Sequence, residues 1–412
     1  MDMKKTVCLF ALAIIAVAAV NAQGVCGCTD SLANNYNPQA TINDGSCTYN
    51  ATSVSVSSSQ ELQTVLNGTS GLVFTDGKLY TNADHGSPQL YTIDTADGHI
   101  LDSVSFSNVM WNDVEDADHD SRYIYLGDHG NNVSGNRTNL HILRVLKSSL
   151  ATGSPQVDTI WFSYSDQSDF TALSSNSTDF DCEAFTVFGD SIYLFTKQWD
   201  SEKTALYSIP KLPGTYSARR IAEWNVSGLV TAATTSPDGD YIVLTGYSSL
   251  LQPFVVLLYD FTGTNFFSGN KRKISLSLPF HQVEAIAAAG DRKFYLTNEY
   301  ITRYGVAIKA KFHKLDLSAY LPAYNTNPPV GLADNFNDEI TIYPNPATNK
   351  LIVSGLDCEG QRFEIRDSAG RMANSGNMTG NEILLPSKIA SGAYVVNIFA
   401  RNRTFSKTFL VK

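Results

Sequence analysis

The chain has 412 residues, of which 43% are hydrophobic and only 17% charged. This composition is too apolar for a disordered chain and too poor in charged residues for a helical bundle, so we expect a mostly β protein. At about 100–200 residues per domain, the length predicts more than one folded unit. The 30 basic and 40 acidic residues give a net charge of −10, which excludes a general nucleic-acid binder because such proteins need a basic surface.

The first segment has the features of a secretory signal peptide over residues 1–22. Lys4 and Lys5 precede an apolar run over residues 7–20, and Ala22 closes a short stretch suited to cleavage. The apolar run is too short to span a membrane. We therefore expect export to the periplasm and an oxidising final environment, in which cysteines can form disulfides.

Residues 24–50 form a short unit rich in Asn, Asp and Gly, bounded by Cys28 and Cys47. A piece of this size cannot bury a core and needs a disulfide or a metal ion. We predict a Cys28–Cys47 disulfide, worth roughly 3 kcal/mol through closure of the loop. The partners of the remaining cysteines stay open; these are Cys26, Cys182 and Cys358.

This unit resembles a Cys-bounded repeat of surface proteins from marine Bacteroidetes, through Gly27-Cys-Thr-Asp30, Asn35-Tyr-Asn-Pro38 and Asp44-Gly-Ser-Cys47. Its polar side chains offer oxygen atoms of the kind that Ca²⁺ binds. The candidate calcium ligands are Asp30, Asn35, Asn37 and Asp44. The alternative is that these residues only form Asx turns.

Residues 52–320 contain a degenerate repeat with a period near 50. One short strand recurs five times, as Lys78-Leu-Tyr-Thr-Asn82, Tyr123-Ile-Tyr-Leu-Gly127, Ser191-Ile-Tyr-Leu-Phe195, Tyr241-Ile-Val-Leu-Thr245 and Lys293-Phe-Tyr-Leu-Thr297. A smaller strand precedes each copy and one or two apolar strands follow it. Four short strands per repeat predict the blades of a β-propeller.

We count five blades, and the long polar insertion over residues 165–180 leaves a sixth blade open. The fifth repeat lacks its own outer strand. Residues 52–57 alternate in polarity and have no other partner, so we expect them to supply that strand and close the ring.

Residues 321–337 are rich in Pro, Asn and Gly, which predicts a linker, and residues 338–412 predict a small immunoglobulin-like β-sandwich. Three motifs of this last unit resemble the C-terminal sorting domain of the Bacteroidetes type IX secretion system. They are Ile342-Tyr-Pro-Asn-Pro-Ala-Thr-Asn-Lys-Leu351, Phe363-Glu-Ile-Arg-Asp-Ser-Ala-Gly-Arg371 and Ser391-Gly-Ala-Tyr394. The resemblance implies recognition by the type IX machinery, an extracellular or outer-surface location and, in many members, attachment to lipopolysaccharide.

Acidic residues recur in the predicted innermost strands. Glu115, Glu183 and Glu284 lie 10, 10 and 11 residues before the recurring Tyr of their blades, so we expect them to occupy one structural position. The other two blades are predicted to place Ser70 and Ala233 there. Side chains two residues apart share a strand face, which adds Asp113 and Asp181 to the channel.

Several converging carboxylates cannot all stay ionised without a cation or raised pKa values. One alternative is therefore a Ca²⁺ ion held by Asp113, Glu115, Asp181, Glu183 and Glu284. The other is a structural role at the blade junctions. Asp116-Ala-Asp-His-Asp120 is expected to be a short acidic turn.

Further polar residues follow the recurring strands, where propellers place binding loops. The candidate ligand-binding residues are Asp128, His129, Asn131, Arg137, Lys197, Asn298 and Glu299. Lys197 is the one cation of this set near the predicted carboxylates, and pairing with Glu183 is its simpler role.

The Asp181-Cys-Glu-Ala-Phe185 and Val283-Glu-Ala-Ile286 strands resemble the esterase-like phytase propellers. That resemblance implies phosphoester chemistry, but holding phosphate requires several Lys and Arg residues, and the predicted channel has few. We therefore favour a secreted or surface binding module for a glycan, a peptide or a cation-linked ligand. The alternatives are a metal-dependent phosphoester hydrolase and a structural or adhesion protein.

Overall fold

The computed structural model describes residues 24–303, 305–321, 341–354, 361–367, 371–400 and 403–412. The predicted signal peptide, almost all of the predicted linker and Cys358 lie outside these ranges. The described chain is almost entirely β, with one short helix, α1 (Lys147–Leu150), and one 3₁₀ turn, η1 (Thr64–Leu66). Within it, no helix is long and apolar enough to cross a membrane.

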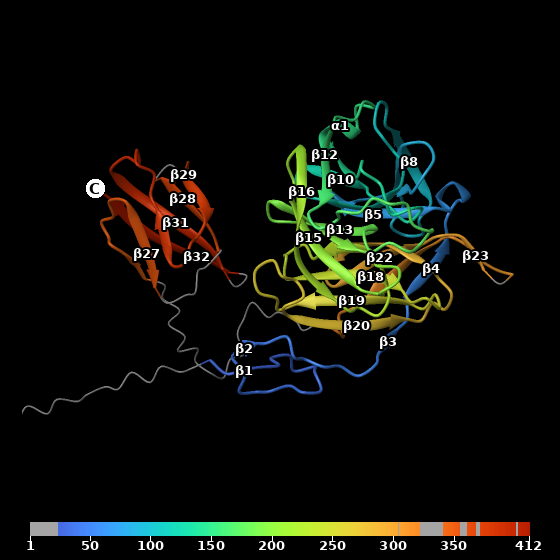
Figure 1. The fold of residues 1–412 in the computed structure, drawn as a ribbon, viewed down its shortest axis with the longest axis horizontal. Coiled ribbons are helices and arrows are strands. Elements are labelled where there is room, and N and C mark those ends of the chain that lie inside the picture. The colour runs from blue at the N-terminus through green and yellow to red at the C-terminus, as the bar shows by residue number, and fades with distance from the viewer. Residues whose placement is uncertain (1–23, 304, 322–340, 355–360, 368–370, 401–402) are drawn as a thin grey trace, which may run out of the picture.

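Five four-stranded blades make up the central domain, and in blades 1 to 4 the four strands follow one another in the chain (Figure 1). Blade 1 contains β5 (Thr69–Thr75), β6 (Lys78–Ala83), β7 (Gln89–Ile93) and β8 (Ile100–Ser105). Blade 2 contains β9 (Val114–His119), β10 (Tyr123–Asp128), β11 (His141–Leu146) and β12 (Val157–Tyr164). Blade 3 contains β13 (Cys182–Phe188), β14 (Ser191–Thr196), β15 (Thr204–Pro210) and β16 (Gly214–Trp224).

Blade 4 contains β17 (Leu229–Thr235), β18 (Tyr241–Tyr247), β19 (Pro253–Tyr259) and β20 (Asn270–Leu276). Blade 5 contains β21 (Val283–Gly290), β22 (Lys293–Asn298) and β25 (Lys311–Asp316), with the hairpin β23 (Ile301–Arg303) and β24 (Val306–Ile308) inserted before its third strand. The innermost strands pack side by side in order, and β21 packs against β5. The ring is therefore a five-bladed propeller, as predicted, and the polar segment over residues 165–180 is a loop rather than a sixth blade.

The strand that closes the ring is not the predicted segment, residues 52–57, but the segment that follows it in the chain. β4 (Ser58–Glu61) pairs antiparallel with β25 and completes blade 5. Within residues 52–57, β3 (Ser53–Val54) instead pairs parallel with β20 at the outer edge of blade 4. The chain therefore runs across the outer edges of two neighbouring blades, and this path fastens the first strands of the domain to its last ones.

Large apolar side chains fill the spaces between neighbouring blades. One cluster joins blades 4 and 5 through side chains such as Val243, Leu257 and Leu296, and another joins blades 3 and 4 through Phe195 and Phe254. Successive side chains along a strand point to opposite faces of the blade. Because neighbouring blades cover both faces, side chains on both faces are apolar. Blades 2 and 3 are also joined by parallel pairing between β12 and β16.

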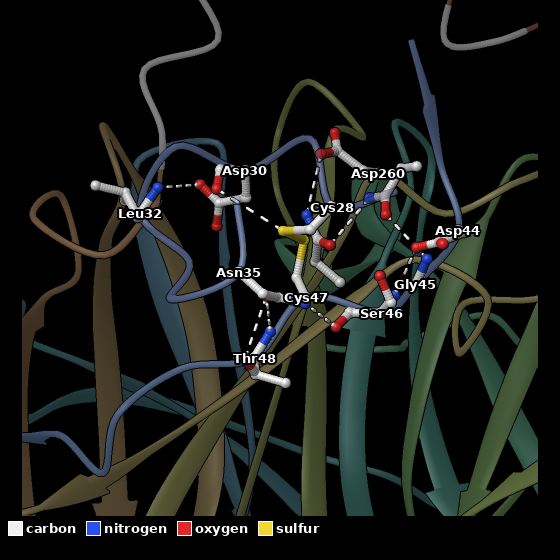
Figure 2. The surroundings of a disulfide bond; sticks show 12 residues. Cys28, Asp30, Leu32, Asn35, Asp44, Gly45, Ser46, Cys47, Thr48 and Asp260 are labelled. Carbon is white, nitrogen blue, oxygen red and sulfur yellow. Dashed lines mark hydrogen bonds between the residues drawn. A yellow bond between two sulfur atoms is a disulfide. The ribbon is translucent and has the colours of Figure 1, made fainter. Parts of the chain in front are cut away.

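The Asn/Asp-rich unit is small and held by the predicted disulfide between Cys28 and Cys47, with a Cα–Cα distance of 4.8 Å (Figure 2). It contains the two-residue strands β1 (Cys26–Gly27) and β2 (Ile42–Asn43). The Asp30 carboxylate fastens the unit to blade 4, because the hydroxyl groups of Tyr259 and Tyr49 donate to it at 2.6 and 2.7 Å. Cys26 is exposed and Cys182 is buried, and neither forms a disulfide within the described residues.

The C-terminal unit has two sheets. The first has the order β26 (Thr341–Tyr343), β27 (Lys350–Ser354) and β30 (Glu382–Leu384). The second has the order β29 (Met372–Asn377), β28 (Arg362–Asp367), β31 (Gly392–Ala400) and β32 (Arg403–Val411). Leu351 of the first sheet and Ile365, Val396 and Phe409 of the second share one apolar core. An immunoglobulin-like strand arrangement remains a prediction.

Candidate functional site: an acidic cavity at one end of the channel

The three glutamates of the innermost strands lie at β-bulges. The pairing register shifts at Glu115 between β9 and β10, at Glu183 between β13 and β14, and at Glu284 between β21 and β22. A bulge inserts one unpaired residue and re-aims its side chain. The structure thus confirms that the glutamates are equivalent, and it shows that the bulge directs them toward the channel.

In blade 4 the equivalent residue is Thr231 and not Ala233, because the register shift lies between Val230 and Ala232. The hairpin between β17 and β18 is longer than those of blades 2 and 3, which moved the alignment by two residues. The Thr231 hydroxyl donates to the Val283 carbonyl at 2.7 Å. Ser70 holds this position in blade 1, as predicted, and its hydroxyl donates to the Glu115 carbonyl at 2.5 Å.

A cavity of about 470 Å³ opens at the end of the propeller where the innermost strands begin. We call this end the cavity face. One wall of the cavity is acidic and is formed by Asp84, Asp113, Glu115, Glu183, Glu284 and Glu299. Another part of the lining is apolar and aromatic and is formed by Trp199, Leu229, Tyr247 and Leu251.

Lys197 provides the buried positive charge of the cavity. Its Nζ lies 2.7 Å from Glu183 Oε2, and both side chains are almost completely buried. The same ammonium lies 4.5 Å from the ring centre of Trp199 and 5.1 Å from that of Tyr247. Burial alone would lower the pKa of Lys197, but Glu183 and Glu284 raise it well above its ordinary value, so the side chain stays charged.

Four other carboxyl groups of the cavity resist ionisation. Burial, followed by repulsion from Glu183, raises the pKa of Asp113 to about 6. Burial raises the pKa of Glu284 to about 7, although Lys197 opposes the shift. Burial and neighbouring carboxylates also raise the pKa values of Glu115 and Glu299 well above the ordinary range. The cavity therefore holds more carboxyl groups than the two cations of its lining, Lys197 and Arg303, can neutralise.

Glu284 is the least satisfied of these groups. Gln282 donates to its Oε1 at 2.6 Å, whereas Oε2 is buried and receives no hydrogen bond of full geometry; Tyr247 lies close enough only to oppose the rise in the pKa of this carboxyl group. The residue is only 4% exposed. A buried acceptor without a partner costs about 1–3 kcal/mol, and such a group on a cavity wall is poised to accept a donor from a ligand.

The second strands of the blades contribute an equivalent set of side chains at one position. Lys197 and Glu299, both predicted, come four residues after the recurring Tyr. Asp84 and Tyr247 occupy the same position in blades 1 and 4 and also line the cavity. Sequence analysis missed both residues, although the offset of four would have found them. In blade 4 the recurring Tyr is replaced by Val243, which hid the correspondence.

Four other predicted ligand-binding residues hold a loop beside the cavity and do not line it. Arg137 Nη2 donates to Asp128 Oδ1 at 2.6 Å, and Arg137 Nη1 donates to the Gly130 carbonyl at the same distance. His129 is completely buried, with Nδ1 2.7 Å from the Cys182 carbonyl oxygen. The Asn131 backbone N–H donates to Asp181 Oδ1 at 2.6 Å. These residues fix the loop over residues 129–139.

Two further predicted residues have structural contacts. Asp181 also accepts a hydrogen bond from Trp199 Nε1 at 2.7 Å, which orients the indole at the cavity. Asn298 donates to the backbone carbonyls of Glu299 and Lys309 and lies 2.8 Å from His313 Nε2. Both residues therefore hold neighbouring groups in place without lining the cavity themselves.

The Asp116–Asp120 segment is largely a strand and not the predicted acidic turn. Asp116 lies inside β9, completely buried, and its Oδ2 accepts the backbone N–H groups of Phe185 and Ala233 at 2.9 and 3.1 Å. One carboxyl group thus links the innermost strands of blades 2, 3 and 4. Asp118 similarly accepts the Val187 N–H at 2.7 Å.

Neither calcium prediction finds a group of ligands in the structure. Within the described residues, no three His, Cys, Asp or Glu side chains lie close enough together to hold a metal ion. In the channel, the Lys197 ammonium already supplies a cation to Glu183. In the N-terminal unit, Asp30, Asn37 and Asp44 each accept the backbone N–H two residues further on, as in Asx turns, and Asn35 accepts the Thr48 N–H. Figure 2 shows the contacts of Asp30, Asn35 and Asp44. Calcium binding stays a prediction.

Fold and site together define a five-bladed propeller with an acidic, aromatic-walled cavity at one end of its channel. Residues 341–412 match the family model of the secretion system C-terminal sorting domain. The chain is therefore a cargo of type IX secretion, with an extracellular or cell-surface location. The predicted periplasmic step and the attachment to lipopolysaccharide stay predictions.

No curated protein matches the sequence. Among solved structures, PorZ of the Porphyromonas gingivalis type IX system matches with a TM-score of 0.30 and 14% identity, over 84% of this chain and 45% of PorZ. This chain thus spans less than half the length of PorZ. A Bombyx mori GH32 β-fructofuranosidase matches with a TM-score of 0.37 and 12% identity, over 84% of this chain and 86% of the enzyme. Similarities this low carry no argument about function.

Proposed function

We propose that the protein is an exported binding protein whose cavity receives a positively charged group, an amine or a guanidinium, from its ligand. The observation that carries this proposal is the buried Oε2 of Glu284, which receives no hydrogen bond of full geometry, in a cavity whose carboxyl groups outnumber its two cations, Lys197 and Arg303. An incoming cation would pair with Glu284 and reduce the repulsion among its neighbours.

Lys197 illustrates how this cavity accommodates a cation. Its ammonium contacts one carboxylate and lies near two aromatic rings. Aromatic faces attract cations more strongly when these are desolvated. A ligand cation facing Glu284 and the wall of Trp199 and Tyr247 would have the same kinds of partner.

The charges of the cavity do not favour the alternative of phosphoester hydrolysis. A phosphate group requires cationic donors, and Lys197 is already paired with Glu183. The carboxyl groups that line the cavity would repel an anion. We therefore favour binding over hydrolysis, and a cationic ligand over a phosphorylated one.

Isothermal titration calorimetry of the exported protein tests the proposal with N-acetylargininamide as the probe. We expect saturable binding, weakened at least tenfold in Glu284→Gln, since hydrogen bonds to charged groups contribute about 1.5–3 kcal/mol. N-acetylcitrullinamide has the same shape without the charge and should not bind. Tighter binding of Ca²⁺, of a phosphomonoester or of a neutral oligosaccharide than of the arginine probe would overturn the proposal.

A further inference from the structure

The cavity face carries most of the exposed apolar side chains of the propeller. Among the described residues of 53–321, only Leu101 and Leu212 are large exposed hydrophobic residues that lie away from this face. The others lie on loops at the end where the innermost strands begin, and include Val133, Phe170, Leu173, Leu250, Phe280 and Val306. We call these six residues the apolar rim.

Single exposed apolar residues are common on protein surfaces, but their concentration on one face marks an interaction site. The rim residues come from blades 2, 4 and 5 and from the connections that follow blades 2 and 4. Three of them are strongly exposed: Leu250 is 81%, Val133 72% and Phe280 60% exposed. Because the connections alternate between the two ends of each antiparallel blade, these loops lie at the same end of the propeller as the cavity.

The loops hold the rim residues outward in fixed conformations. Val133 lies in the loop that Arg137 fastens through its bonds to Asp128 and Gly130. The backbone N–H of Leu173 donates to the Ser134 carbonyl at 2.9 Å, which joins the two long loops of this side. Leu250 lies in a tight turn in which the backbone N–H groups of Leu250 and Gln252 donate to the Ser248 hydroxyl oxygen at 3.3 and 3.2 Å. Such fixed contact residues lose little entropy on binding.

Phe280 combines exposure with backbone strain. Its φ is +66°, a left-handed conformation that is rare for a bulky residue and costs about 1–2 kcal/mol. It lies in the loop between β20 and β21, directly before the strand that carries Glu284. A strained residue that holds a phenyl ring in solvent suggests a function outside the folded chain itself.

We infer that the cavity face docks a polypeptide partner that inserts a Lys or Arg side chain into the cavity and packs flanking apolar side chains on the rim. This inference rests on the proposed function, because the charge of the cavity selects the basic anchor. A buried charged anchor enclosed by an apolar ring that excludes water is the arrangement found at the centre of protein–protein interfaces. A small amine would leave the rim uncovered, which is why we favour a polypeptide.

The test compares two probes on the exported protein, N-acetylargininamide and the pentapeptide acetyl-Leu-Phe-Arg-Phe-Leu-amide. We expect the pentapeptide to bind at least tenfold more tightly. In the triple variant Val133→Ser/Leu250→Ser/Phe280→Ser this gain should disappear while the arginine probe keeps its affinity. The matched control Leu101→Ser/Leu212→Ser, which removes exposed apolar side chains elsewhere, should behave like the wild type.

The outcomes separate the two proposals. Equal pentapeptide affinity in the rim variant and the wild type overturns the docking surface but leaves the cationic cavity standing. Failure of both probes to bind overturns both proposals. Self-association of the wild type that the rim variant loses, measured by sedimentation velocity, assigns the rim to a second copy of the chain and overturns the basic partner.

Discussion

Replacing Glu284 by Gln should stabilise the protein at pH 8 and have no effect near pH 4.5. Burial raises the pKa of Glu284 from its ordinary 4.5 to about 7, so the folded protein holds this proton more tightly than the unfolded chain does. A carboxyl group with a raised pKa contributes stability at low pH that is lost as the pH rises from about 4.5 through about 7. Glutamine mimics the protonated form and escapes that loss.

The size of the effect follows from the two pKa values. At 1.36 kcal/mol for each pH unit between 4.5 and 7, ionisation of Glu284 costs about 3 kcal/mol at pH 8. For a domain of this size, this corresponds to a rise in the melting temperature of about 6–12 °C in Glu284→Gln. Differential scanning calorimetry at pH 4.5 and pH 8 measures both values.

A surface carboxylate serves as the matched control. Glu223 is exposed and pairs with Lys203 and Arg220, so Glu223→Gln should change the stability by less than about 1 kcal/mol. If Glu284→Gln instead destabilises the protein at pH 8, then Glu284 is ionised and well paired in the folded state. That result would refute the reasoning about the unpartnered carboxyl group.

The other predictions concern ion pairing, blade contacts and pH. Lys197→Met should lower the free energy of unfolding by about 3–5 kcal/mol, because Glu183 stays buried without a partner. Adding Glu183→Gln should recover much of this loss. Equal losses in the single and the double variant, measured by urea unfolding, would argue against the pair. Asp116→Ala should cost several kcal/mol, about 3 or more, because the backbone N–H groups that it caps in three blades lose their acceptor; an unchanged urea midpoint would show that water replaces the carboxylate. Affinity for N-acetylargininamide should rise as the pH increases through about 6–7, since the raised pKa of Glu284 makes protonation compete with the cation; titrations showing no proton release would contradict this.

The groups facing Glu284 set the pH range of that last prediction. The charged and titratable groups that share the cavity lining are Asp84, Asp113, Glu115, Glu183, Lys197, Glu202, Tyr247, Glu299 and Arg303. Asp113, with a pKa of about 6, ionises in the same interval. Because Asp113 and Glu284 ionise in neighbouring pH ranges, the affinity should change gradually across the interval.

The repeat made the fold predictable from sequence. A recurring Tyr-centred strand, seen five times, indicated both the number of blades and the equivalence of Glu115, Glu183 and Glu284. The bulges that aim these glutamates at the channel were not predictable, because no particular residue type marks a bulge in the sequence. The longer hairpin of blade 4 explains why Ala233 was aligned in place of Thr231.

Residues of the candidate site were predictable where the same position recurs in several blades. They were not predictable where their role depends on contacts outside their own strand. Lys197 and Glu299 lie where the repeat placed them. By contrast, nothing local shows that Asp128 and Arg137 pair with each other and fix a loop. The choice between Ser58–Glu61 and residues 52–57 as the closing strand likewise depended on pairing with residues more than 240 positions away.

The central claim is that a cation binds between Glu284 and the aromatic wall of the cavity. A crystal structure of the exported protein with N-acetylargininamide tests it most directly. We predict the guanidinium within hydrogen-bond distance of the Glu284 carboxylate and near the rings of Trp199 and Tyr247. A probe bound only outside the cavity, or an ordered metal ion coordinated by Glu115, Glu183 and Glu284, would contradict the claim.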